Sequence, residues 1–447
     1  MSGHAAPVTP AKGMPLHVKV LIGFVTGAVL GLLAYRYGQG NATVDALITY
    51  VAQPIGQTFL NLLFMLVLPL MFSALILGVA ELGDIATLGR VGSRTLAYTA
   101  VVTAIAVGLG LLLVNLIQPG VAFDPALRES VMAGSSIRSH EIAGAHPALS
   151  GVDMLLGIVP RNVLRAAVED QFLSVMFFAL LLGVALVLTP SPATTAFKAA
   201  IQGLNELVMK LIGLVVRLTP YAVACLMFAL SARFGWDLLF TLGRFVFTVL
   251  LAIALHMFVV LPLWVQFKGG MSPAFFFRGS QEAILTAFST ASSAGTLPTT
   301  LRVAERNLGL PAHVARFVLT IGASANHHGT ALFEGLTTLF LAQCFGVTLD
   351  LVQQASLLVL CILASIGTAG VPAGSLPVIA MLLGYLQVPP DAIGLILGVD
   401  RLLDMCRTAL NVTGDLATAV VVARSEQSDG HAARRHALLD PAYEPDG

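Results

Sequence analysis

The chain has 447 residues, of which 57% are hydrophobic and only 11% are charged, and its mean hydropathy is +0.87. This composition excludes an ordinary soluble protein and predicts a polytopic α-helical membrane protein. Its 24 Lys and Arg residues balance 24 Asp and Glu residues, so net charge does not indicate a nucleic-acid or strongly acidic partner.

The first 270 residues are predicted to contain six membrane spans. The first apolar run, Val18–Tyr35, has spanning length and no obvious signal-peptidase site after it, so we expect a retained helix. Lys12 before this run and Lys19 at its start, with Arg90 and Arg94 between the second and third runs, favour a cytoplasmic N-terminus. Several of the later apolar stretches exceed one upright span and are expected to be tilted or broken. The five later stretches lie at about 45–79, 94–117, 150–189, 203–232 and 237–265.

After residue 270, small and helix-breaking residues interrupt the apolar runs twice. The interruptions are Phe288–Pro298 and Ala364–Pro377, and each precedes a longer apolar helix with polar residues, near 312–345 and 391–423. Close packing through small residues is the alternative explanation for one such run. Two runs, each before a polar helix, favour a doubled unit with a transporter's central site, because irregular backbone at membrane depth needs protein or water partners.

The last apolar helix is predicted to carry one polar face. At about 100° per residue, six polar side chains fall within an arc of roughly 100°, while Leu403 and Leu410 lie outside it. Each Asp or Arg at the centre of a membrane helix costs about 2.5–3.5 kcal/mol, so we expect this face to turn toward protein partners. The six residues are Asp400, Asp404, Arg407, Thr408, Asn411 and Asp415.

Four segments resemble the signature segments of the dicarboxylate/amino acid:cation symporter family, the glutamate transporters. They are Ser292–Pro298, Asn326–Thr330, Gly367–Pro372 and Asp404–Asp415, in the family's order, and the span pattern is similar from about residue 15 to 425. The resemblance implies an all-α fold of eight transmembrane helices and two re-entrant helical hairpins, related by inverted repeats. It also implies a homotrimer in a lipid bilayer, namely a prokaryotic plasma (inner) membrane, with both termini cytoplasmic.

The resemblance divides the chain into six parts. A mobile transport core is expected to slide against a static scaffold. The parts are a cytoplasmic N-terminal segment (1–14), three spans that mix scaffold and transport helices (15–118), an external loop (119–149), spans four to six (150–268), the transport core with both hairpins and the last two spans (269–424), and a charged C-terminal tail (425–447).

The resemblance assigns the polar face to substrate binding. Arg407 would take the side-chain carboxylate of an acidic amino acid bidentately, and Asp404 would hold the α-ammonium group. Alternatively, these two residues pair with each other at i,i+3, and Ser292 caps its own helix. Further substrate contacts are expected from Ser292, Ser293, Thr330, Gly370, Val371, Thr408 and Asn411. Ala291 and Met405 stand where some relatives carry an additional arginine, which leaves open how the Asp404 and Arg407 charges are balanced.

The resemblance also implies sodium sites, since sodium prefers hard oxygen ligands. One site would combine the Asp415 carboxylate with carbonyls near Gly322, Asn326 and Asn411, and a second would use Ser324, Ser365, Ile366 and Thr368. The family's third site is incomplete, because His328 replaces an aspartate and Val102 replaces a hydroxyl residue beside Thr103. We therefore predict fewer than three sodium ions, with His327 or His328 as a proton carrier unless both are packing residues.

Three functions remain open at this point. The leading one is a symporter of L-glutamate or L-aspartate, coupled to sodium, protons or both, by an alternating-access elevator movement. The second is a symporter of C4-dicarboxylates or neutral amino acids. The third is an intramembrane metalloenzyme with His327, His328 and Glu334, which is disfavoured because adjacent histidines on a regular helix do not face one metal. The four cysteines, Cys225, Cys344, Cys361 and Cys406, lie in apolar segments at spacings that suit neither disulfides nor zinc.

Overall fold

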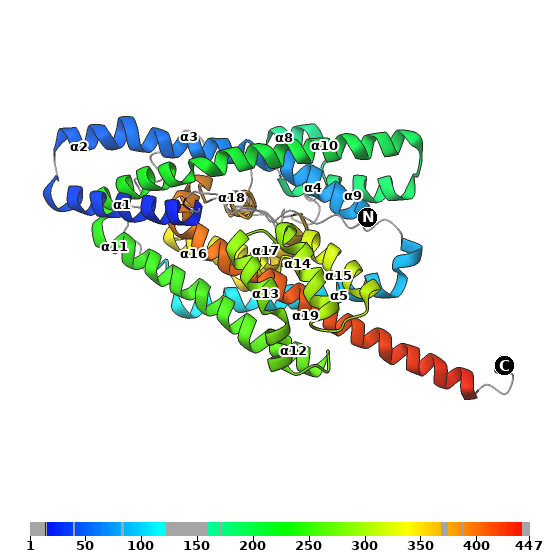
Figure 1. Cartoon of the computed structure of the whole chain (residues 1–447). Helices are drawn as coiled ribbons and strands as arrows, with labels where there is room; N and C mark the ends of the chain where they lie inside the picture. The colour runs from blue at the N-terminus through cyan, green and yellow to red at the C-terminus, as the bar shows by residue number, and fades with distance from the viewer. Residues whose placement is uncertain are drawn as a thin grey trace, which may run out of the picture.

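The computed structural model describes residue 14 and residues 16–38, 41–81, 85–121, 159–169, 172–367, 374–386 and 388–439. Every regular element within these ranges is a helix (Figure 1). Three helical stretches of the described chain are long and apolar enough to cross a membrane, namely Val18–Tyr37, Val91–Ile117 and Pro192–Phe267, the last of which contains several helices. The predicted all-α class is therefore confirmed. The predicted external loop lies almost wholly outside the described residues.

The N-terminal helices gather along one side of the molecule (Figure 1). α1 (Leu16–Tyr37) packs along the first part of α11 (Thr219–Leu255). The two backbones approach closely at Gly23, which has no Cβ. A Cβ at this position would lie only 2.3 Å from the carbonyl oxygen of Pro220, so a larger residue would push the helices apart. The other helices of this side are α2 (Ala42–Leu47), η1 (Ile48–Ala52), α3 (Gln53–Phe64), α4 (Val67–Glu81), α8 (Val163–Val168), α9 (Phe172–Leu188), α10 (Pro192–Val215) and η2 (Val216–Leu218).

α11 connects this side to the rest of the molecule. Its helix bends at Gly235, whose φ of 59° is a left-handed conformation that favours glycine, and then runs toward η3 (His256–Val260) and α12 (Leu261–Phe267). The bend falls between the two predicted spans 203–232 and 237–265. The first of these spans is itself divided, because α10 ends at Val215 and Pro220, which has no N–H to donate, stands at the start of α11.

The second half of the chain builds the core of the molecule. α16 (His328–Cys344) is buried along its whole length apart from Gln343, and it packs against α5 (Ile85–Ile117) and α19 (Leu397–Leu439). The surrounding helices are α13 (Pro273–Thr290), α14 (Ser293–Arg306), α15 (Ala312–Ala325), α17 (Leu351–Gly367), α18 (Leu376–Tyr385) and η4 (Pro390–Leu395). α19 therefore lies at the centre of this half, with α13, α14, α15 and α16 packed against it.

Two features of this half differ from the sequence prediction. The helix predicted near 312–345 is interrupted at Asn326 and His327, whose backbones leave the helical conformation. The side chain of Asn326 donates a hydrogen bond to Asp415, which gives this interruption a tertiary cause that local sequence does not show. The predicted charged tail is helical as far as Leu439, so α19 continues well beyond the predicted apolar segment 391–423 (Figure 1).

Candidate functional site

The polar face of α19 is buried within the protein. Asp404 and Arg407 each expose only 2% of their surface, and Asp415 exposes 3%. Thr408 and Asn411 are buried as well. A charged face in an apolar protein requires partners from the same or neighbouring helices, and the contacts of each residue identify them.

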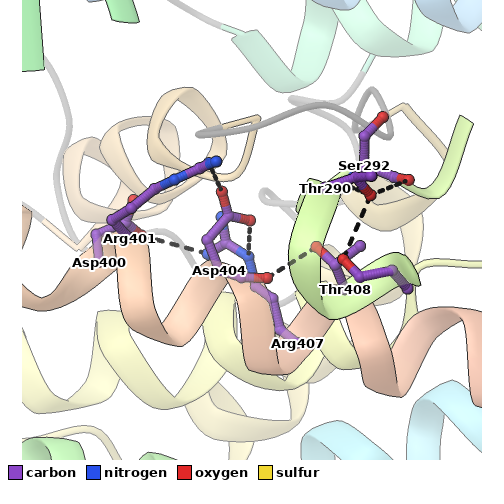
Figure 2. Close-up of polar contacts among 8 residues, drawn as sticks. Thr290, Ser292, Asp400, Arg401, Asp404, Arg407 and Thr408 are labelled. Atoms are coloured by element: carbon purple, nitrogen blue, oxygen red, sulfur yellow. Dashed lines mark hydrogen bonds and ion pairs between the residues drawn. The ribbon is translucent and has the colours of Figure 1, made fainter. Parts of the chain in front are cut away.

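Four charged residues of α19 form a network that we call the charged cluster: Asp400, Arg401, Asp404 and Arg407. The Oδ1 atom of Asp404 lies 2.9 Å from Nη2 of Arg407 and accepts a hydrogen bond from its Nε at 3.1 Å. Nη1 of Arg407 lies 3.4 Å from Oδ1 of Asp400, and Nη1 of Arg401 donates to Oδ2 of Asp404 at 3.2 Å (Figure 2). The i,i+3 pairing that the sequence left as an alternative is therefore present in this structure. A substrate carboxylate that binds Arg407 would therefore compete with carboxylates of the protein.

The guanidinium of Arg407 also lies against an aromatic ring. Its Cζ is 4.6 Å from the centroid of Phe333 on α16, a distance typical of a cation–π contact. The ring excludes water from one face of the guanidinium and strengthens its attraction to carboxylates. Sequence reasoning missed Phe333. The available signal was its i,i+3 spacing from Thr330, which places both residues on one face of α16.

The turn between α13 and α14 lies beside this part of α19 (Figure 2). Ala291 at the turn adopts a left-handed φ of 50°, and Ser292 caps α14 by accepting a hydrogen bond from the Gly295 N–H at 3.0 Å. Ser293 is buried in the first turn of α14. Thr408 donates to the backbone carbonyl of Asp404 at 2.8 Å. The hydroxyl of Ser292 thus has the capping role that the sequence offered as an alternative, in a turn that packs against the predicted substrate site.

Asn411 connects α19 to the beginning of α16. Its Oδ1 accepts hydrogen bonds from the N–H groups of Gly329 at 2.8 Å and Thr330 at 3.2 Å, and its Nδ2 donates to the Thr330 hydroxyl at 2.9 Å. The first N–H groups of a helix have no partner within that helix, so this side chain acts as a cap supplied by another element. Asn411 and Thr330 are brought together as predicted residues of one site.

The predicted first sodium ligands also meet. The Asn326 Nδ2 donates to Oδ1 of Asp415 at 2.7 Å, and a Cβ on Gly322 would lie 2.6 Å from the same oxygen, so only glycine allows this approach. The Oδ1 of Asn326 is buried and has no hydrogen-bond partner among the described residues. A buried carboxylate with an additional amide oxygen is a donor set that suits a hard cation such as sodium.

The second predicted sodium site is only partly described. Ser365 is buried in α17 and Ile366 belongs to the last turn of that helix. Ser324 lies in α15, near its end at Ala325. Thr368 lies outside the described residues, as do the predicted substrate contacts Gly370 and Val371.

The two predicted proton carriers, His327 and His328, are fully buried but face different neighbours. Nδ1 of His327 lies 3.2 Å from the carbonyl oxygen of Ser365. The ring of His328 lies 5.3 Å from that of His256 on η3, measured between centroids, and it covers Gly414, where a Cβ would collide at 1.8 Å. Because the histidines diverge, the metalloenzyme geometry is absent, and the described residues contain no group of three His, Cys, Asp or Glu residues arranged for a metal.

His256 is a further residue that sequence reasoning missed. It is fully buried, and neither of its ring nitrogens bonds to a described side chain. Its helix changes to a π-turn at this residue, and such turns often occur at functional sites. A single histidine in an apolar stretch gave no sequence signal for this position.

Comparison with known proteins finds relatives over most of the chain. Residues 16–425 match the model of the sodium:dicarboxylate symporter family. The chain is 32% identical, over 91% of its length and 94% of the relative's, to a proton/sodium-glutamate symport protein of Geobacillus stearothermophilus. It is 31% identical to a proton/glutamate-aspartate symporter of Escherichia coli (strain K12), covering 91% of this chain and 92% of that one. It is 30% identical, over 96% of both chains, to a C4-dicarboxylate transport protein of Anaeromyxobacter sp. (strain K).

Proposed function

This chain belongs to the sodium:dicarboxylate symporter family, and from that premise we propose that it carries L-glutamate or L-aspartate across the membrane. It is an integral membrane protein and a cation-coupled symporter, and not an enzyme. The relatives that it matches are named for glutamate and aspartate in some cases and for C4-dicarboxylates in others, so family membership leaves the substrate to be decided by the site.

The Asp404–Arg407 ion pair is the observation that carries this proposal. An acidic amino acid has a carboxylate that matches the guanidinium fork of Arg407 and an ammonium group that matches Asp404. Binding then exchanges one ion pair for two, and leaves neither Asp404 nor Arg407 as an uncompensated buried charge. A plain C4-dicarboxylate provides no cation for Asp404.

We propose that Asp415, Asn326 and the Gly322 and Asn411 carbonyls hold one sodium ion, and that Ser324, Ser365, Ile366 and Thr368 hold a second. The support for the first site is the buried carboxylate together with the unpaired Oδ1 atom of Asn326. We expect fewer than three sodium ions, because His328 stands where the family's third sodium site has its carboxylate ligand. His327 and His328 remain the predicted proton carriers, consistent with relatives named for proton and sodium coupling.

The proposed architecture has eight transmembrane helices and two re-entrant hairpins related by inverted repeats, α13–α14 and α17–α18. The turn of α13–α14 packs beside α19, which supports a role in closing the site. The tip of α17–α18 lies outside the described residues. Residues 269–424 would form the transport core that moves in an elevator cycle, and we expect a homotrimer in a prokaryotic plasma membrane with both termini cytoplasmic.

A C4-dicarboxylate substrate is the second candidate. The presence of two guanidinium groups, Arg401 and Arg407, on opposite oxygens of Asp404 favours it, because two cations suit two carboxylates. A neutral amino acid is disfavoured because it has no side-chain carboxylate to replace Asp404 at Arg407. Its one carboxylate, on the α-carbon, would bind elsewhere in the site.

Purified protein in proteoliposomes, with separately imposed sodium and proton gradients, tests these candidates. We expect labelled L-glutamate or L-aspartate to accumulate when sodium is high outside, and succinate to compete weakly. Accumulation of succinate that neither acidic amino acid inhibits would reject the proposal in favour of the second candidate.

A further inference from the structure

The Asp404 carboxylate is shared between two arginines, one on each oxygen. Arg407 holds Oδ1, with contacts of 2.9 and 3.1 Å, and Arg401 holds Oδ2 at 3.2 Å (Figure 2). The two arginines lie on either side of Asp404 along α19, at i−3 and i+3. A carboxylate held in this way can release one guanidinium without losing its position or all of its compensation.

The surroundings of Arg401 differ from those of Arg407. Arg407 is fully enclosed by Asp400, Asp404 and Phe333, whereas the side chain of Arg401 remains 13% exposed. Arg401 lies at the boundary with the N-terminal helices, in a small cavity that Leu16, Val20 and Phe59 also line. Its Nε is buried without a hydrogen-bond partner among the described residues, so its contact with Asp404 uses only part of its donor capacity.

The charges of the cluster sum to zero only if Arg401 is included. Asp400 and Asp404 contribute two negative charges, and Arg401 and Arg407 contribute two positive ones. If a substrate carboxylate binds the guanidinium of Arg407, the two aspartates have only Arg401 and the substrate's ammonium group as close cations. Arg401 thus reduces the negative charge that the substrate meets on entering the site.

We propose that Arg401 is a positioning residue for substrate exchange. It retains Oδ2 of Asp404 while Oδ1 passes from Arg407 to the ammonium group of the substrate, and it offsets the negative charge that the substrate brings. This inference rests on the proposed function, and it adds a determinant of substrate affinity outside the residues that contact the substrate.

Uptake by Arg401→Met and by the parent, measured in proteoliposomes at fixed sodium, tests the inference. The KM for the acidic amino acid is expected to rise about tenfold or more with little change in maximum rate, since one charge-assisted contact is lost. The increase in KM should follow the net charge of the substrate. It should be larger for succinate, whose net charge is −2, than for the acidic amino acid, whose net charge is −1, and smaller for a neutral amino acid. Arg401→Lys should recover much of the affinity because the charge is retained. Arg165→Met, which removes an exposed arginine paired with Glu169 outside the proposed transport core, is the matched control and should behave as the parent.

The same substitution in an Asp404→Asn background separates positioning from folding. We expect Arg401→Met to raise KM clearly less there than in the parent background, because the carboxylate that it positions is gone and only its offset of the substrate's charge is lost. An unchanged KM in the single variant, an equal increase in both backgrounds, or a fall in maximum rate alone would each overturn the inference. Failure of the proposed function is seen separately, as an absence of acidic amino acid uptake by the parent.

Discussion

The charged cluster and the buried polar residues around Asp415 respond to burial in opposite ways. In the charged cluster, each of the four charges has an oppositely charged partner within 3.4 Å. The second region contains Asn326, His256, His328 and Asp415. Among the described residues, the Oδ1 of Asn326 has no hydrogen-bond partner and the rings of both histidines bond to no side chain. The first region must therefore exchange contacts to bind a ligand, whereas the second can gain contacts by binding a cation.

The largest predicted effect comes from removing the central cation of the charged cluster. Arg407→Ala leaves two buried aspartates with Arg401 as their one nearby cation in the charged cluster, and it removes the group that binds the substrate's carboxylate. Loss of a buried charged contact costs about 2–5 kcal/mol of binding free energy. Uptake of L-glutamate and L-aspartate in proteoliposomes should fall by about a hundredfold or more. Undiminished acidic uptake by this variant, with Arg165→Ala as the control for loss of an arginine, would remove Arg407 from the substrate site.

A second large effect should appear in the other region without altering substrate preference. Asp415→Asn replaces the carboxylate of the first sodium site by an amide, which is a weaker ligand for a hard cation. The sodium concentration for half-maximal uptake should rise about tenfold, by analogy with the loss of a charged contact. Asp237→Asn, at an exposed position, serves as the control. If sodium dependence is the same in Asp415→Asn and parent, cation binding does not involve this carboxylate.

The sequence predicted which residues belong to the two regions better than it predicted the contacts among those residues. Helical periodicity is local, so it correctly placed Asp404, Arg407 and Asn411 on one face of the last helix. It could not show that Phe333 lies against Arg407 or that His256 meets His328, because those contacts depend on the register between helices far apart in the chain. The interruption at Asn326 was missed for the same reason, since its partner is Asp415, 89 residues later.

A more selective effect is expected from Asp404→Asn, which sharpens the comparison within the charged cluster. Loss of the carboxylate removes the ammonium partner but leaves Arg407 for carboxylates. The KM for acidic amino acids should increase about tenfold more than that for succinate, as expected for one charged hydrogen bond. Competition assays with both substrates measure this ratio. Equal losses for both would indicate that Asp404 serves folding or pairing alone.

The smallest predicted effect is a gain in the second region. His328→Asp introduces a carboxylate where the ring now covers Gly414, at the position predicted for the third cation site. The smaller side chain fits the available space, and uptake should depend more steeply on sodium concentration at fixed pH. His328→Asn, of the same size but uncharged, is the control. Equal steepness in the two variants and the parent would show that this position does not contribute to cation binding.

The central claim is that substrate binding exchanges the Asp404–Arg407 contact, and a structure of the protein with sodium and L-aspartate bound tests it most directly. We predict that the substrate's side-chain carboxylate replaces Asp404 on Arg407, that its ammonium group contacts Oδ1 of Asp404, and that the present Nη2–Oδ1 distance of 2.9 Å lengthens beyond contact. A bound substrate with the Asp404–Arg407 pair still intact, and its carboxylate held elsewhere, would contradict the account.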